Sequence, residues 1–289
     1  MDGRTRGALL GGLLLLSAGV LYRDVIAKLV HDWSHDDNYS HGFLIVPIAL
    51  YFAWERRGKL LAAARQPSLL GLLVVAGSVL TLMAGVLGAE LFLTRISLIG
   101  VIAGSVLFIL GWQHLRILAL PIAFLLLMIP IPAIIFNQIA FPLQLLASRF
   151  GEWTLSALSI PVLREGNVIT LASTQLEVAE ACSGIRSLIS LLTLGIVYGY
   201  FMHPSVAVRT IIALATIPVA ILANGMRVAG TGVAAHYYGP EAAEGFFHTF
   251  SGWLVFLAAF AMLFVIHRII AWWNPPATST ATPKMTAAA

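Results

Sequence analysis

The chain has 289 residues, of which 59% are hydrophobic and only 10% are charged, whereas roughly 25% are charged in a soluble globular domain. This composition excludes an ordinary soluble protein and predicts several membrane-spanning segments. The formal net charge of +4 does not indicate nucleic-acid binding, because the basic residues do not cluster on a polar domain. The single cysteine, Cys182, excludes an internal disulfide framework and the usual multi-cysteine zinc or iron–sulfur sites.

Apolar windows long enough to cross the hydrocarbon core predict an all-α integral membrane protein with about eight transmembrane helices. They lie near residues 7–22, 41–54, 68–88, 95–112, 115–130, 185–202, 206–224 and 250–271. The first is interpreted as a retained helix rather than a cleaved signal peptide, because it runs on into more apolar sequence. We expect one polytopic membrane domain over residues 1–273 and a disordered cytoplasmic tail over residues 274–289.

The stretch from Ile131 to Glu180 differs from the apolar windows, because charged residues and prolines interrupt it. We place it on the outer surface, partly as an interfacial amphipathic helix between the fifth and sixth spans. Within it, residues 167–171 and 175–179 flank a short polar turn, which predicts a small β-hairpin. This hairpin leads the chain to Cys182.

The distribution of charge predicts that both termini lie inside. With eight spans, the inner segments then carry ten of the 17 Lys and Arg residues but only two of the 13 Asp and Glu residues. An excess of basic residues inside is the usual bias of membrane proteins. Reversing the orientation would contradict this rule at nearly every loop.

Three separate elements bring unusual polar residues to the outer face in this topology. Glu180, Cys182 and Arg186 lie at the start of the sixth span, Asn224 and Arg227 at the end of the seventh, and His248 at the start of the eighth. The hydropathy argument did not use the identity of these residues. Their convergence therefore points to a site.

These residue types fit acyl transfer through a thioester. A cysteine at a helix amino terminus beside cations has a lowered pKa, so Cys182 is the candidate nucleophile. His248 can accept and return a proton at neutral pH, and Arg227 can stabilise an oxyanion. Singly, a lone cysteine is more often a buried hydrophobe and an edge arginine a snorkelling anchor, and only the convergence favours a catalytic role.

The polar stretch from Trp33 to Gly42 contains histidines and aspartates, but its spacing matches no familiar metal signature. We interpret it as an outer loop that shapes a substrate entrance. No metal and no cofactor is expected.

The sequence Glu180-Ala-Cys182-Ser-Gly-Ile-Arg186, followed by Asn224-Gly-Met-Arg227 and His248, resembles the signature of the exosortase and archaeosortase family. The early Tyr39-Ser-His41-Gly-Phe segment and the hydropathy profile agree with this resemblance. It implies that Cys182, Arg227 and His248 are catalytic, with Arg186, Glu180, Asn224 and His41 in binding or supporting roles.

The resemblance further implies a cysteine protease or transpeptidase in the bacterial inner membrane, with its active site facing the periplasm. Its expected partners are membrane lipids and exported proteins that end in a sorting signal, made of a Pro-Glu-Pro type motif, a transmembrane helix and a basic tail. Nucleic acid is not an expected partner. A membrane thiol acyltransferase acting on lipid and a polytopic transporter are the alternative functions, although a transporter requires charges near the bilayer midplane.

Overall fold

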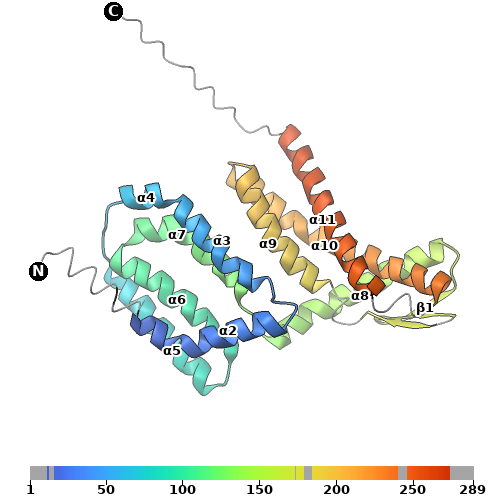
Figure 1. The fold of residues 1–289 in the computed structure, drawn as a ribbon, viewed down its shortest axis with the longest axis horizontal. Coiled ribbons are helices and arrows are strands. Elements are labelled where there is room, and N and C mark those ends of the chain that lie inside the picture. Colours follow the sequence, from blue (N-terminus) through green and yellow to red (C-terminus); the bar gives the residue numbers. More distant parts are fainter. Residues whose placement is uncertain (1–11, 13–15, 173, 179–183, 240–245, 274–289) are drawn as a thin grey trace, which may run out of the picture. The chain divides into compact units, whose positions relative to one another are not determined.

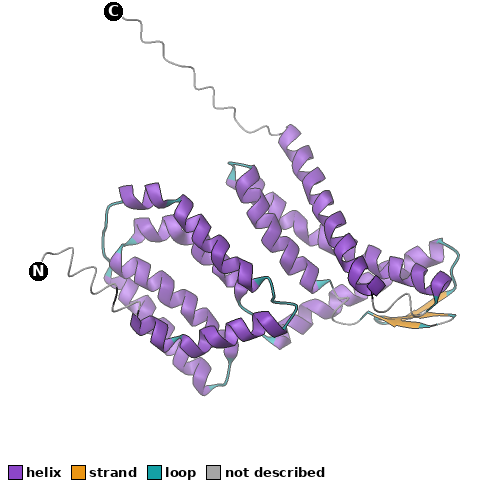
Figure 2. Cartoon of the chain, in the orientation of Figure 1, coloured by secondary structure: helices purple, strands orange, loops and turns teal. Residues whose placement is uncertain are grey.

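A computed structural model describes residues 12, 16–172, 174–178, 184–239 and 246–273, without the side chains of residues 246–251. The described chain is mainly helical, with one small sheet (Figures 1 and 2). It divides into two compact units, Met1–Gln138 and Ile139–Ala289. The predicted tail at 274–289 lies outside the described residues, and the single-domain assignment stays a prediction.

The first unit consists of helices up to the break near Pro130. They are α2 (Arg23–His35), α3 (Gly42–Glu55), α4 (Arg57–Ala62), α5 (Leu69–Leu87), α6 (Leu91–Ile109), α7 (Trp112–Phe124) and the 3₁₀ helix η1 (Leu125–Met128), followed by the start of α8 (Ala133–Ala157). Helices α5 and α6 pack so closely that a Cβ at Gly71 would lie 2.2 Å from the backbone nitrogen of Phe108. Helix α2 was not predicted, and it takes in the first part of the expected loop at 33–42.

An ion pair fixes α2 against α6. The guanidinium of Arg95, which is 3% exposed, donates to the Asp32 carboxylate. A cation this deeply buried requires a partner, because its desolvation costs several kcal/mol. The pair therefore sets how these two helices pack.

The long helices have the length and composition of membrane spans. Five described helices are long and apolar enough to cross a membrane, and there are six if Trp112–Met128 and Ala133–Ala157 form one broken span. Many of their large apolar side chains face outward, such as Leu73 at 68% and Leu87 at 85% exposure. Such surfaces suit a lipid environment. The all-helical membrane class is confirmed. The count of eight spans stays a prediction, because half of residues 7–22 lies outside the described residues and α3 is shorter than the five long helices.

The second unit combines a three-helix bundle with a sheet. After α8 come β1 (Val162–Glu165), β2 (Val168–Leu171), β3 (Gln175–Glu177), α9 (Ile185–Met202), α10 (Val206–Tyr238) and α11 (Phe246–Trp273). The strands form an antiparallel sheet in the order β1-β2-β3, with Ile169 opposite both Arg164 and Leu176. The predicted hairpin is thus confirmed as β2 and β3, and β1 extends it.

Helix α10 has 33 residues and continues well past the predicted end of the seventh span at residue 224. Its later half packs on α8 and the sheet, where Val228 and Ala235 share a buried core with Leu155 and Ile169. A Cβ at Gly225 would lie 2.8 Å from the ring of Phe150, so the backbone approaches α8 closely. This packing gives the residues after 224 an apolar surface to cover, which is why the helix continues.

Candidate active site

The start of α9, the middle of α10 and the start of α11 meet in the second unit. A Cβ placed on Gly184 would lie 2.8 Å from the Asn224 Cγ, and one placed on Gly252 would lie 3.5 Å from an Arg227 Nη. Gly184 immediately precedes α9, while Gly252 follows His248 by one helical turn. The three elements that carry the predicted site residues are therefore in contact.

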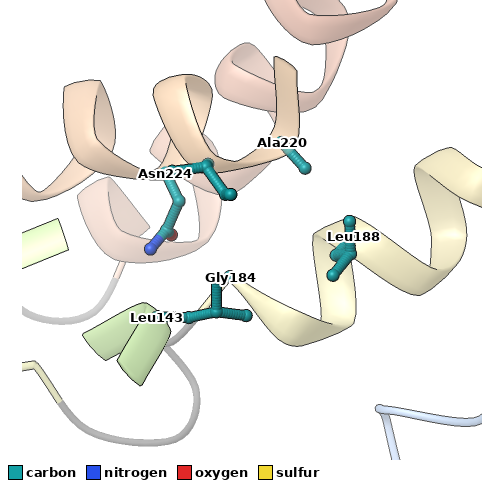
Figure 3. Close-up of a pocket in the computed structure, with 6 residues that line it drawn as sticks. Leu143, Gly184, Leu188, Ala220 and Asn224 are labelled. Atoms are coloured by element: carbon teal, nitrogen blue, oxygen red, sulfur yellow. The ribbon is translucent and has the colours of Figure 1, made fainter. Parts of the chain in front are cut away.

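Gly184 is required by two independent features of the backbone. Its φ is +80°, a left-handed conformation that L side chains rarely adopt, and Asn224 fills the space where a side chain would lie. The Asn224 side chain extends toward Gly184 (Figure 3). Asn224 is 4% exposed, so this contact is part of the buried interior.

Beside this contact lies a small cavity of about 10 Å³. Its lining residues come from α8, α9 and α10 and are Leu143, Gly184, Leu188, Ala220, Ile221 and Asn224 (Figure 3). The volume holds roughly one water molecule.

The sheet ends a few residues before Cys182 in the chain. The Val178 N–H donates to the Asn167 carbonyl at 2.9 Å, and the Asn167 amide donates back to the Val178 carbonyl at 3.3 Å. Val178 is 2% exposed. Arg164 joins the sheet to α8 by donating to the Glu152 carboxylate at 2.6 Å. Residues Glu180 and Cys182 follow directly and lie outside the described residues.

The first turn of α9 presents positive charge. It contains Arg186 but no acidic residue. The leading amides of a helix lack intrahelical acceptors and carry the positive end of the helix dipole. An anionic group in front of α9 would therefore be stabilised.

Arg227 is half-buried on α10, and its guanidinium lies against α11 near Gly252. His248 belongs to the first turn of α11 by its backbone, and its side chain lies outside the described region. Neither Gly252 nor Gly184 was predicted as a site residue. The Ser-Gly pair before the apolar run signals the Gly184 turn, while the sequence gives no signal for Gly252.

His41 lies in the first unit, apart in the chain from the other candidates. Its Nε2 donates to the Leu127 carbonyl at 3.1 Å, and burial lowers the pKa of the imidazole below 6.5 despite that bond. The Trp33 indole donates to the Met128 carbonyl at 2.9 Å, and the Ile131 N–H donates to the Tyr39 hydroxyl at 3.1 Å. The polar stretch at 33–42 thus satisfies backbone groups at the end of η1.

Proline explains why the Met128 carbonyl is available. In a continuing α-helix it would accept from residue 132, which is a proline without an N–H, and the Trp33 indole supplies the missing donor. The Leu127 carbonyl would accept from Ile131, whose N–H donates to the Tyr39 hydroxyl instead, and His41 replaces that donor. Among the described residues, no three or more His, Cys, Asp or Glu side chains group to hold a metal ion.

The family model described as transmembrane exosortase matches residues 33–265, most of the chain. No curated protein and no solved structure matches the chain. The matched range includes α9, α10 and the start of α11, the elements that meet at Asn224 and Arg227.

Proposed function

The chain belongs to the transmembrane exosortase family, a family of membrane transpeptidases, and on this premise we propose that it cleaves the C-terminal sorting signals of exported proteins. The proposed signal is a Pro-Glu-Pro type motif followed by a transmembrane helix and a basic tail. We place the reaction at the periplasmic face of a bacterial inner membrane. The observation that carries this proposal is the contact of α9, α10 and α11 at Asn224 and Arg227.

In the proposed first step, the Cys182 thiolate attacks the scissile carbonyl carbon and forms a C–S bond. The negative charge that develops on the carbonyl oxygen is stabilised by Arg227. Collapse breaks the C–N bond, and protonated His248 gives its proton to the leaving amine. The products are a thioester on Cys182 and a free amino terminus on the departing helix.

In the second step, an amine or a water attacks the thioester carbonyl. His248 takes the proton of this nucleophile, and the C–S bond breaks to release the thiolate. The enzyme is thereby regenerated with a Cys182 thiolate and a protonated His248. Both steps use one cysteine, one base and one fixed cation.

The environment at the start of α9 supports thiolate formation. Cys182 precedes Gly184 by two residues, and the first turn of α9 contains Arg186 and no acidic residue. Such positions lower the pKa of a thiol from about 8.5. We propose that Asn224 positions the chain at Gly184 and that Glu180 contributes to substrate binding.

Replacing Cys182 with Ala tests the proposal. A co-expressed exported protein with the three-part signal is expected to be shortened by the wild type and to keep its full length with the variant. Circular dichroism and thermal melting of the purified variant show whether it is folded. Shortening of the substrate by a folded Cys182→Ala variant would overturn the mechanism.

The covalent intermediate identifies the acyl donor. The chain has one cysteine, so rapid acid quenching and mass spectrometry assign any thioester to Cys182 without ambiguity. A peptidyl adduct is the expected result. A fatty acyl adduct would instead make the protein a lipid acyltransferase.

A further inference from the structure

A second cavity lies at the opposite end of the α9–α10–α11 bundle from Asn224. Its volume is about 380 Å³, in the range of small-molecule sites. It is lined by Met202, His203, His267, Arg268, Ala271 and Trp272. The end of α9, the start of α10 and the end of α11 lie together there (Figure 1).

His203 has an unused hydrogen-bond donor in this cavity wall. Its ring is 4% exposed, and the Ser205 backbone N–H donates to its Nδ1 at 3.1 Å. Because Nδ1 accepts, the neutral ring carries its proton on Nε2. Nε2 is buried and has no hydrogen-bond partner among the described residues. A buried donor without an acceptor is costly, so an acceptor on a bound group would stabilise it.

The surrounding charge is positive. Arg268 lines the cavity, and Arg209 lies beside it, where its Nε donates to the His203 carbonyl at 2.7 Å. The sequences of α9, α10 and α11 contain no Asp or Glu. No salt bridge among the described residues involves Arg268 or Arg209, so this end of the bundle favours an anionic group.

A second histidine of the cavity wall, His267, is also held in place by a hydrogen bond. The Tyr198 hydroxyl and His267 Nδ1 share a hydrogen bond of 2.7 Å, and His267 is 8% exposed. The rings of His203 and His267 are perpendicular, with centroids 6.4 Å apart. Two fixed imidazoles and a flexible arginine on one cavity match the several oxygen acceptors of a phosphate group.

The depth of the cavity indicates where the phosphate comes from. The 18 residues of α9 span about 27 Å, close to the thickness of the hydrocarbon core. If Asn224 lies near one membrane surface, the cavity lies at the headgroup level of the other. Trp272 is 80% exposed at its rim, as is typical of tryptophan at a membrane interface.

We propose that this cavity binds the phosphate of one anionic phospholipid in the leaflet opposite the candidate active site. His203 Nε2 and the Arg268 guanidinium donate to the phosphate oxygens. Met202 and Trp272 flank the glycerol and the first acyl carbons. This lipid holds the ends of α9 and α11 together, and its binding does not depend on the chemistry proposed for Cys182.

Two variants test the site by native mass spectrometry of the full chain, titrated with phosphatidylglycerol or with phosphatidylcholine. His203→Asn keeps an acceptor for the Ser205 N–H but lacks Nε2, and Arg268→Gln removes the charge. Each is expected to weaken phosphatidylglycerol binding about tenfold, as for one charge-assisted hydrogen bond. Arg116→Gln, at an exposed arginine on α7, is the matched control and is expected to bind like the wild type.

Phosphatidylglycerol binding that is selective in the wild type and weakened by both variants supports the site. Equal retention of phosphatidylglycerol by the wild type, His203→Asn and Arg268→Gln would overturn it, as would equal binding of both lipids by the wild type. Titration with inorganic phosphate separates the two sources of the group. Binding of free phosphate with the same variant dependence, but without lipid, would overturn the lipid assignment.

Discussion

Replacing Gly184 with Ala probes the turn that immediately precedes α9, two residues after the proposed nucleophile Cys182. The left-handed backbone costs an alanine about 1–2 kcal/mol. The new Cβ would also lie 2.8 Å from the Asn224 Cγ, and such overpacking costs about 1–3 kcal/mol. The free energy of unfolding is therefore expected to fall by about 2–5 kcal/mol.

Gly239 provides a control for the backbone part of this change. Its φ of +86° and ψ of 173° also lie in a region that favours glycine, but nothing lies within 4 Å of an added Cβ. Gly239→Ala is expected to lose only a backbone part, about 1–3 kcal/mol. Each Gly→Ala change also reduces the conformational entropy of the unfolded chain by the same amount, so this contribution cancels when the two variants are compared.

The assay is equilibrium unfolding of the purified protein in mixed micelles, followed by helical circular dichroism. Labelling of the single cysteine with a membrane-impermeant maleimide gives a second measurement, because Gly184 is two residues from Cys182. We expect Gly184→Ala to change the labelling rate and Gly239→Ala to leave it unchanged. Equal losses of stability in the two variants would refute the steric contact with Asn224.

Three further outcomes are expected. Burial lowers the pKa of His41, so the unfolded chain binds more protons than the folded chain below pH 6.5. The free energy of unfolding should thus be highest above pH 6.5 and fall as the pH drops below it. In denaturation experiments across this pH range, His41→Gln should lose less of its free energy of unfolding than the wild type. Asp32→Asn leaves the buried Arg95 cation unpaired and should lower the free energy of unfolding by about 3 kcal/mol in the same assay. An unchanged free energy of unfolding would mean that the ion pair is dispensable. Arg227→Gln should slow substrate processing about 10²–10³-fold at unchanged melting temperature, with partial recovery in Arg227→Lys, and a normal rate would exclude it as the oxyanion donor.

Local patterns determined the class of the protein and most of its elements. Apolar length predicted the membrane helices, so residues 185–202 coincide with α9 and 68–88 closely match α5. Alternation and a polar turn predicted the hairpin that became β2 and β3. Motif spacing identified the candidate site residues, since the order of polar groups along the chain needs no knowledge of packing.

Contacts between distant segments decided the rest. Hydropathy predicted that the seventh span ends at residue 224, but α10 continues because its later half packs on α8 and the sheet rather than on lipid. Trp33 and His41 were assigned from sequence only to an outer loop, and the structure adds that they donate to the Met128 and Leu127 carbonyls, the first of which Pro132 leaves without a helical donor. Hydropathy is summed over neighbours in sequence, whereas these bonds and packing surfaces depend on which backbone groups meet in space.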